Sequence, residues 1–253
     1  MSSAPRIYVP VRLQPGKPAP LDANQSKYLL RVMRLSDGDP VRVFNGQDGE
    51  WRAIIIQDSA KKASIRPVEQ TRDQIATPDL TLLFAPLKKT RTDFVVEKAC
   101  ELGVQRIQPV MTEFTQSSRV RSDRLQAVVI EAAEQTERMD IPVVEDDMPL
   151  LKALNAWPTD RPLFYCDEAG GAKPMQETLS GRAIEAAGIL IGPEGGFSAA
   201  ERGRLRGLPF VVPVTLGPRI LRAETAAVAA LTLWQSLLGD WRDHPYLPET
   251  QNG

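Results

Sequence analysis

The sequence has few of the residues on which many enzymes and secreted proteins depend. It contains two cysteines, Cys100 and Cys166, which are not spaced as a CxxC pair, and a single histidine, His244. This scarcity argues against a disulfide framework, a zinc site, and the nucleophile–histidine pairs of hydrolases. Proton transfer would therefore fall to carboxylates, lysine, tyrosine or the substrate itself, and we expect no bound metal.

Long apolar segments are also missing. No run approaches the ~20 apolar residues that a membrane-spanning helix needs, and the N-terminus, MSSAPRIYVP, lacks the basic stretch and apolar core of a signal peptide. The composition, 42% hydrophobic and 25% charged over 253 residues, is that of a globular protein with one large or two ordinary domains. We expect a cytoplasmic protein that makes no membrane contact.

Charge is nearly balanced over the whole chain but divides unevenly along it. The net charge of −1 alone argues against a general nucleic-acid-binding protein. Residues 1–76 hold 12 Lys and Arg against 8 Asp and Glu, a net +4, whereas the remaining residues hold 19 against 24, a net −5. A basic module joined to an acidic one indicates a polyanion that is bound mainly at the N-terminal end.

The N-terminal part has the pattern of a β-rich domain. Runs rich in apolar residues, at 41–44 and 51–56, lie on either side of the turn-forming segment Asn45–Gly49, which predicts a β-hairpin. A further alternating run, Lys62–Val68, predicts another strand.

A short helix is predicted before this hairpin, at Gln25–Met33. We expect residues 1–73 to form a small β-barrel. The polar stretch Glu69–Pro78 follows the last strand, and we place an interdomain linker at residues 74–78 within it.

The remaining sequence alternates between buried-strand and helix patterns. The predicted strands are Leu80–Ala85, Arg106–Val110, Val143–Val144, Leu163–Cys166, Gly188–Ile191 and Phe210–Leu216. Capping signals precede three of the helices, at Thr90, Ser122 and Ser198. This alternation predicts a parallel sheet covered on both faces over residues 79–240, followed by a polar tail at 241–253.

Polar, glycine-rich segments follow three of the predicted strands. They are Cys166–Gly171, Ile191–Phe197 and Leu216–Thr225. Ligands of open α/β sheets bind at the carboxyl ends of strands, and glycine lets the backbone approach a ligand closely. Neither the GxGxxG fingerprint nor a phosphate-binding Gly-Lys-Ser/Thr is present. One such loop alone is more often an ordinary turn, but three together favour a binding site.

Two of these segments carry a recognisable family pattern. IGPEGGFSAAE and LGPRILRAETAA, at this spacing, closely resemble the knotted methyltransferases of the SPOUT superfamily. Within it, the chain resembles the 16S rRNA (uracil-N3)-methyltransferase family, RsmE. Further similar segments cover most of the chain: RIYVP, LLRVMRLSDGDPVRVFNG, EKACELGVQRIQPV and EAAEQ.

The resemblance implies a fold, a cofactor and a substrate. The barrel would be a PUA-like RNA-binding module, and the second domain an α/β methyltransferase domain with a trefoil knot. The chain would be a homodimer that methylates N3 of a uridine in 16S rRNA, within the assembled small ribosomal subunit. S-adenosylmethionine would be held by the three loops, at Cys166, Asp167, Glu168, Ile191, Gly192, Pro193, Gly195, Gly196, Leu216, Gly217, Ile220 and Leu221.

Four residues of these loops suit the chemistry of such a transfer. Uracil N3 becomes nucleophilic once it loses its proton, and an arginine can stabilise the resulting anion. Arg222 is the first candidate and Arg219 the second. Glu194 or Glu224 could accept the proton. Alternatively, Glu194 stabilises a helix N-terminus and Glu224 pairs with a nearby arginine.

Other residues are candidates for RNA contact. Arg31 and Arg34 are three apart, which places them on one face of the predicted helix. The remaining candidates are Arg6, Lys88, Lys89, Gln135 and Arg138. The segment Thr136–Arg138 departs from the family pattern, because Glu137 introduces a charge where small residues are usual.

Two other functions remain open from the sequence. A knotted methyltransferase with similar loops could modify another nucleotide of rRNA or tRNA. The fold could also serve as a non-catalytic RNA-binding assembly factor, although intact glycines in all three loops argue against this.

Overall fold

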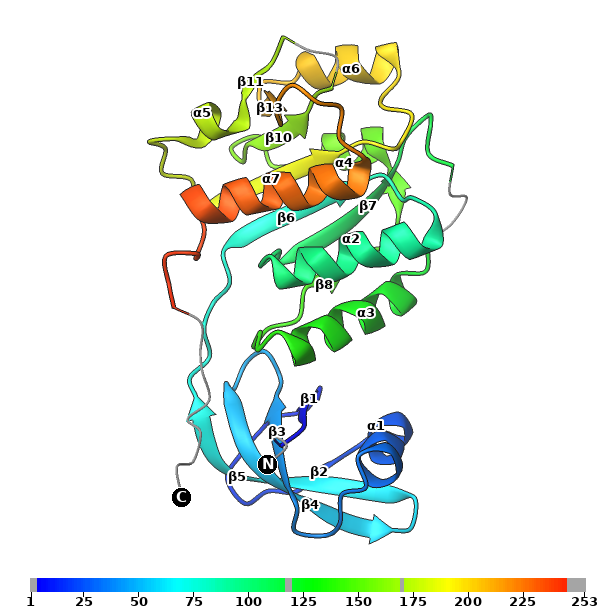
Figure 1. The fold of residues 1–253 in the computed structure, drawn as a ribbon, viewed down its shortest axis with the longest axis vertical. Coiled ribbons are helices and arrows are strands. Elements are labelled where there is room, and N and C mark those ends of the chain that lie inside the picture. Colours follow the sequence, from blue (N-terminus) through cyan, green and yellow to red (C-terminus); the bar gives the residue numbers. More distant parts are fainter. Residues whose placement is uncertain (1–3, 117–119, 169–170, 245–253) are drawn as a thin grey trace. The chain divides into compact units, whose positions relative to one another are not determined.

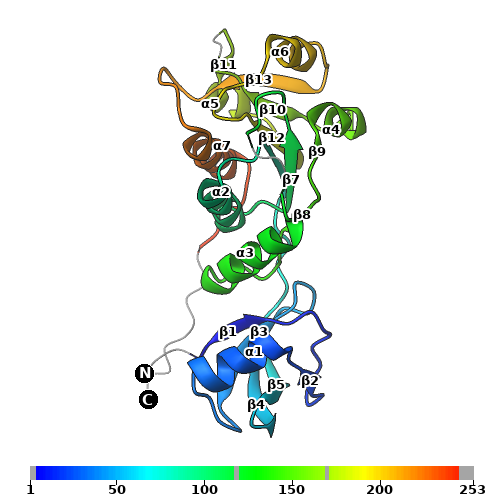
Figure 2. The ribbon, with the colours of Figure 1, turned by 90° about the vertical axis from the view of Figure 1, so that its right-hand side faces the viewer.

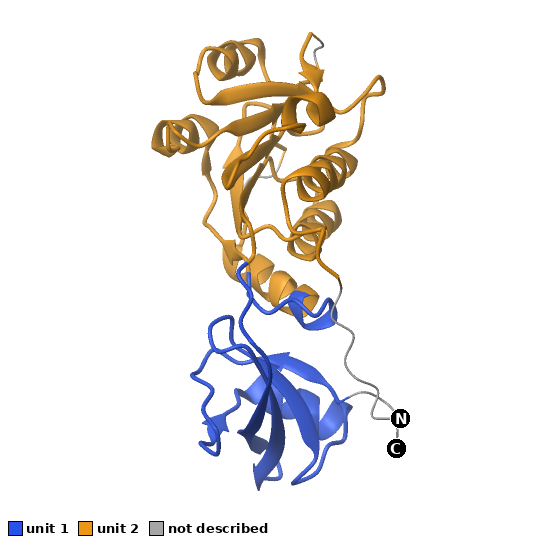
Figure 3. Ribbon diagram, turned by 90° about the vertical axis from the view of Figure 1, so that its left-hand side faces the viewer, with its two compact units in different colours: residues 1–76, 133–141 blue, residues 77–132, 142–253 orange. Residues whose placement is uncertain are grey.

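The computed structural model describes residues 4–116, 120–168 and 171–244. The chain divides into two compact units, residues 1–76 with 133–141 and residues 77–132 with 142–253 (Figure 3). The boundaries expected from the sequence assign residues 133–141 to the second domain, whereas in the structure they cluster with the first unit.

The first unit is built on a five-stranded sheet with the strand order β1-β3-β4-β5-β2 (Figure 1). Its strands are β1 (Arg6–Tyr8), β2 (Ala19–Pro20), β3 (Pro40–Phe44), β4 (Glu50–Ser59) and β5 (Lys62–Arg72). The predicted hairpin is confirmed, because β3 pairs antiparallel with β4 and the Asn45 side chain accepts hydrogen bonds from the backbone N–H groups of Gln47 and Asp48. β5 continues to Arg72, so the polar stretch that begins at Glu69 is strand at its start.

The single helix expected before the hairpin is replaced by two shorter segments. α1 (Ala23–Lys27) begins after Asp22, whose side chain forms a capping box, and a π-helical turn (Tyr28–Val32) follows. Arg31 lies in that turn, whereas Arg34 lies beyond it with a left-handed φ of 58°. The expectation that these two arginines share one helical face is therefore wrong, because the helix ends between them.

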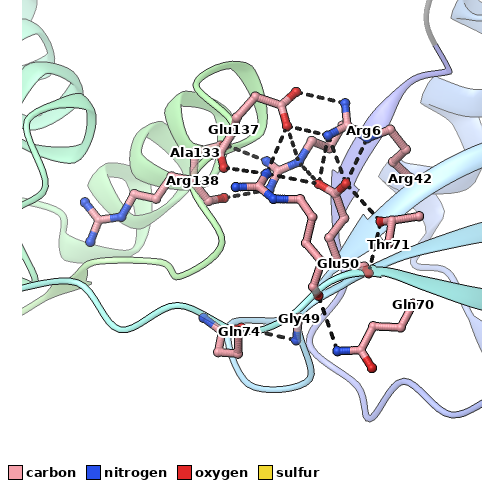
Figure 4. A network of polar contacts seen from close by, with 11 residues as sticks. Arg6, Arg42, Gly49, Glu50, Gln70, Thr71, Gln74, Ala133, Glu137 and Arg138 are labelled. Atoms are coloured by element: carbon pink, nitrogen blue, oxygen red, sulfur yellow. Dashed lines mark hydrogen bonds and ion pairs between the residues drawn. The ribbon is translucent and has the colours of Figure 1, made fainter. Parts of the chain in front are cut away.

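A buried ion-pair network joins the strands of the first unit to residues 133–138 (Figure 4). The Glu50 carboxylate is fully buried and accepts hydrogen bonds from Arg6 Nε at 2.6 Å and from Arg42 Nη2 at 2.9 Å. Arg6 also donates through Nη1 to the Ala133 carbonyl at 2.7 Å and through Nη2 to the Arg138 carbonyl at 2.8 Å. These contacts incorporate residues 133–141 into the first unit.

Glu137 adds a second carboxylate to this network. It pairs with Arg42 and lies 3.2 Å from Arg72 Nη1, while its own backbone has a left-handed φ of 61°. Burial raises the pKa of Glu137, but the hydrogen bond from Arg42 and the neighbouring guanidinium charges outweigh it and lower the pKa. The family departure at Glu137 thus has a structural role, because its charge compensates buried arginines.

The second unit is built on an eight-stranded sheet with the order β11-β13-β10-β12-β6-β7-β8, and β9 pairs with β7. Its strands are β6 (Asp79–Phe84), β7 (Arg106–Met111), β8 (Val143–Val144), β9 (Met148–Pro149), β10 (Leu163–Cys166), β11 (Lys173–Pro174), β12 (Ala186–Ile191) and β13 (Val211–Thr215). Every pairing in it is parallel, as the sequence predicted. The two-residue strands β9 and β11 were not expected from the sequence.

Helices cover both faces of this sheet. They are α2 (Lys89–Glu101), α3 (Ser122–Gln135), α4 (Leu150–Ala156), α5 (Met175–Leu179), α6 (Ala199–Arg206) and α7 (Ala223–Leu237). α2 and α7 pack together on one face, and α4 lies on the other (Figure 2). The predicted arrangement of a parallel α/β sheet is confirmed. None of the helices in the described residues is long and apolar enough to cross a membrane.

Two of the predicted helix starts had different outcomes. Ser198 forms the expected capping box at the start of α6. The box expected at Thr90 is wrong, since α2 begins with Lys88 at its N-cap and no capping side chain. The nearby Thr92 hydroxyl instead donates to the Leu87 carbonyl at 2.9 Å, which leaves the N-terminus of α2 without a side-chain acceptor.

Candidate active site

Three neighbouring strands of the second unit end at the same edge of its sheet. β13, β10 and β12 are adjacent and parallel, so their carboxyl ends lie side by side. The loops that leave these ends surround a cavity of about 650 Å³, a volume typical of small-molecule and cofactor sites. The cavity is lined by these loops, the start of α7 and one residue of α2: Arg91, Cys166–Glu168, Ile191–Glu194, Gly196 and Val214–Ala223, with Ala226.

The cavity brings together most of the residues singled out from the sequence. All those expected to bind the cofactor line it except Gly195, at which an added Cβ would lie 3.4 Å from Phe114 Cβ. Of the catalytic candidates, Glu194, Arg219 and Arg222 line the cavity. Glu224 does not, although it lies in the first turn of α7 directly behind the lining. The first loop is described only in part, because residues 169–170 lie outside the described residues.

Glycine is required at two points of the cavity wall. Gly196 has a φ of +70°, a left-handed conformation that favours glycine, and an added Cβ would lie 2.3 Å from Glu168 Oε1, so the Glu168 side chain would have to move. Gly217 has a φ of +111° and no atom within 4 Å of an added Cβ. A side chain at Gly217 would therefore enter open space at the cavity.

The first loop is held by a buried carboxylate. Asp167 accepts hydrogen bonds from the Tyr165 hydroxyl at 3.2 Å and from Arg206 Nη2 at 2.5 Å. Burial and the Asp167 charge raise the pKa of Tyr165, so its hydroxyl remains a donor. Burial and the charge of Glu168 raise the pKa of Cys166 to about 12, so its thiol stays protonated and is a poor nucleophile. Asp167 thus fixes the loop, and Cys166 supplies an uncharged wall.

The arginines at the cavity differ in whether they are paired. Arg219 and Arg222 are exposed, and within the described ranges neither side chain has an ion-pair partner. Arg91, which the sequence analysis did not single out, contacts both candidate carboxylates: Nη1 pairs with Glu194, and Nε lies 3.6 Å from Glu224 Oε1. One signal in the sequence could have identified Arg91, because cations without an acidic residue are unusual in the first turn of a helix.

The residues expected to contact RNA fall into two groups. Arg31, Arg34, Lys88, Lys89 and Gln135 are exposed and available. Arg6 and Arg138 are not, since 4% of the Arg6 side chain and 8% of the Arg138 side chain are exposed. Arg6 pairs with Glu50, and Arg138 pairs with Asp140 at 2.8 Å. Assigning Arg6 and Arg138 to RNA contact is therefore wrong, because both guanidinium groups are occupied inside the first unit.

Comparison with known protein families identifies both parts of the chain. Residues 75–235 match an RNA methyltransferase domain, and residues 21–68 match an RNA methyltransferase PUA domain. The chain is 32% identical over 231 residues to ribosomal RNA small subunit methyltransferase E of Rickettsia conorii, a match that covers 89% of this chain and 93% of that protein. It is also 32% identical to the Synechocystis protein of that name, over 86% of this chain and 73% of that protein.

Solved structures agree with these sequence matches. The crystal structure of ribosomal RNA small subunit methyltransferase E from Neisseria gonorrhoeae, bound to S-adenosyl methionine, has a TM-score of 0.85 and 30% identity, covering 94% of this chain and 99% of that chain. A Legionella pneumophila protein in complex with the same cofactor has a TM-score of 0.84 and 29% identity, covering 94% and 100%. The chain therefore belongs to the RNA methyltransferase family of ribosomal RNA small subunit methyltransferase E.

Proposed function

We propose that this protein transfers a methyl group from S-adenosylmethionine to N3 of one uridine of 16S rRNA during maturation of the small ribosomal subunit. The observation that carries the proposal is the cavity at the ends of β10, β12 and β13, which combines a glycine-rich wall with Arg219 and Arg222, two exposed cations that form no ion pair with any described residue.

The residues present fit S-adenosylmethionine. The cavity volume suits a nucleoside with an amino-acid tail, and the open space beside Gly217 is one that a side chain would fill. Glu168 lines the cavity as an exposed carboxylate that can accept hydrogen bonds from ligand hydroxyl or ammonium groups. Bound there, S-adenosylmethionine supplies an electrophilic methyl group.

The chain's own residues provide orientation and charge. Uracil N3 gives up its proton, which leaves an anion whose negative charge spreads over O2 and O4. The N3 anion then forms a bond to the methyl carbon as the sulfur–carbon bond breaks, and the charge is neutralised. Arg222, at the N-cap of α7, can donate to one of those oxygens, and Arg219 is the second candidate. The proton leaves either to a carboxylate, Glu194 or Glu224, or directly to solvent.

Replacing Gly217 with valine tests the cofactor site. The branched side chain would enter the cavity, and a φ of +111° is costly for any residue with a Cβ. We expect calorimetry to show loss of S-adenosylmethionine binding with the fold largely retained by circular dichroism. Gly203→Ala, in α6 with no atom within 4 Å of an added Cβ, is the control and should bind normally. Wild-type affinity in Gly217→Val would remove Gly217 from the site.

RNA contact by the first unit is tested by replacing Arg31 and Arg34 together with alanine. Both are exposed, and each is a candidate phosphate contact. Removing two such cations should reduce the slope of log RNA affinity against log salt concentration by about two. Cofactor affinity should not change. The matched control replaces the exposed Arg182 and Arg204 of the second unit. An unchanged salt slope in the Arg31/Arg34 variant would show that RNA binds elsewhere.

Three further features complete the proposal. We propose a homodimer, for which light scattering should give about twice the 27.9 kDa of one chain; a fully active monomer would contradict it.

We place the protein in the cytoplasm, with the assembled small subunit as its substrate, because that is where subunits mature; finding it in a membrane fraction would contradict this. The trefoil knot implied by the family resemblance stays a prediction, for which tracing the loops around α7 in a crystal structure is the test.

A further inference from the structure

Arg91 occupies an electrostatically unfavourable position. It lies in the first turn of α2, which has no acidic residue, and the N-cap residue Lys88 offers no side-chain hydrogen bond. A cation at a helix N-terminus lies at the positive end of the helix dipole, which is unfavourable. Arg91 is therefore poorly explained by the stability of α2 and must be compensated by groups outside the helix.

That compensation comes from two carboxylates on different segments of the cavity wall. Arg91 Nη1 pairs with Glu194, in the loop between β12 and α6, and Arg91 Nε lies 3.6 Å from Glu224 Oε1, in the first turn of α7. All three side chains are half-buried, and Glu224 Oε2 is buried without a hydrogen-bond partner among the described residues. Arg91 is the one cation that pairs with either carboxylate among the described residues.

The two segments have different tasks in the function proposed above. Glu194 stands between Pro193 and Gly195, and its loop forms part of the cavity wall assigned to the cofactor. Glu224 is two residues after Arg222, the N-cap of α7 and the candidate for stabilising the uracil anion. One guanidinium thus joins the cofactor loop to the turn that sets the position of Arg222.

We propose that Arg91 is a positioning residue that couples the cofactor loop to Arg222, so that cofactor binding and placement of the anion-stabilising cation depend on each other. The proposal rests on the function proposed above. Its Glu194 contact supports the shape of the cofactor cavity, and its Glu224 contact fixes the backbone from which Arg222 reaches the base.

The two contacts can be separated by mutation. Arg91→Ala, Glu194→Gln and Glu224→Gln are compared by titration calorimetry with S-adenosylmethionine and by single-turnover methylation of small subunits at saturating cofactor. Loss of the half-exposed Arg91–Glu194 pair should raise the cofactor Kd about fivefold. Misplacement of Arg222 should lower the rate at saturating cofactor about tenfold or more. Arg91→Ala shows both effects, Glu194→Gln chiefly the first and Glu224→Gln chiefly the second.

A double-mutant cycle distinguishes the proposed coupling from a purely structural role. Under the coupling, adding Arg91→Ala to Glu194→Gln should raise the cofactor Kd no further, because the Arg91–Glu194 contact is already lost. Arg91→Lys keeps the positive charge but lacks the several N–H donors of the guanidinium group. It should therefore restore either the cofactor Kd or the single-turnover rate, but not both. Arg204→Ala, an exposed arginine of α6, is the control and should match wild type.

Several outcomes would overturn the coupling. Arg91→Ala variants with Kd and rate within twofold of the control would show that Arg91 has no such role. Equal losses of both quantities in all three variants would show a general loss of structure instead. A wild-type protein that binds cofactor but methylates no RNA would contradict the proposed function, and the Arg91–Glu194 cycle would still be decided by calorimetry.

Discussion

Replacing Arg222 with alanine should lower the single-turnover rate of methyl transfer about 100-fold or more, the scale on which loss of one preorganised donor to a developing anion acts. Arg222 lines the cavity, is exposed, and has no ion-pair partner within the described ranges, so its charge is available to the substrate. Because the side chain is not packed into the core, its removal should leave the fold unchanged. Quench-flow with cofactor-saturated enzyme measures the rate.

The companion variants locate the proton acceptor. Arg219→Ala should have the smaller effect if Arg222 is the main donor. Glu194→Gln should slow the chemical step comparably only if that carboxylate accepts the N3 proton, and raising the pH should then restore its rate, since hydroxide replaces the lost acceptor. A near wild-type rate in Arg222→Ala with cofactor bound would transfer the anion-stabilising role to Arg219.

Replacing Glu50 with glutamine should destabilise the first unit by about 3–5 kcal/mol, because removing one partner of a buried ion pair leaves uncompensated charge. Glu50 is fully buried, and its carboxylate faces Arg6, Arg42 and, at 3.8 Å, Arg72. Glutamine has nearly the same shape, so the loss reports charge rather than packing. Hydrogen exchange read by mass spectrometry separates β3–β5 of the first unit from the strands of the second.

The control is an exposed pair in the same sheet. Arg52 and Glu69 are 3.0 Å apart, with 46% and 63% of their side chains exposed. Glu69→Gln should cost less than about 1 kcal/mol. If the backbone amides of β3–β5 are as well protected from hydrogen exchange in Glu50→Gln as in Glu69→Gln, the network contributes little to stability. Residues 133–141 would then be held by other contacts.

The sequence predicted those features that depend on local pattern. The β3–β4 hairpin followed from the Asn45–Gly49 turn, and the strands of the second unit followed from short apolar runs between helical segments. Because parallel strands bring their carboxyl ends to one edge, three loops far apart in sequence were expected to share a site, and they line one cavity. Their individual roles stay predictions.

Long-range ionic contacts could not be predicted in this way. Arg6 was expected at an RNA surface, yet it pairs with a carboxylate 44 residues away and a carbonyl 132 residues away. Arg91 meets Glu194 across 103 residues. An isolated arginine in a sequence looks the same whether it is solvated or buried, since only the tertiary fold decides which carboxylate it meets. The capping box expected at Thr90 is absent because α2 begins earlier, at Lys89, so Thr90 lies inside the first turn of the helix.

Methylation of uridine N3 can be detected by nucleoside mass spectrometry. Small subunits from cells that lack this protein are incubated with the purified chain and S-adenosylmethionine, and their 16S rRNA is digested. We predict that 3-methyluridine appears, approaching one per subunit, and that it is absent when Gly217→Val replaces the wild-type chain. Transfer of methyl to a ribose hydroxyl or to another base, or no transfer at all, would contradict the account.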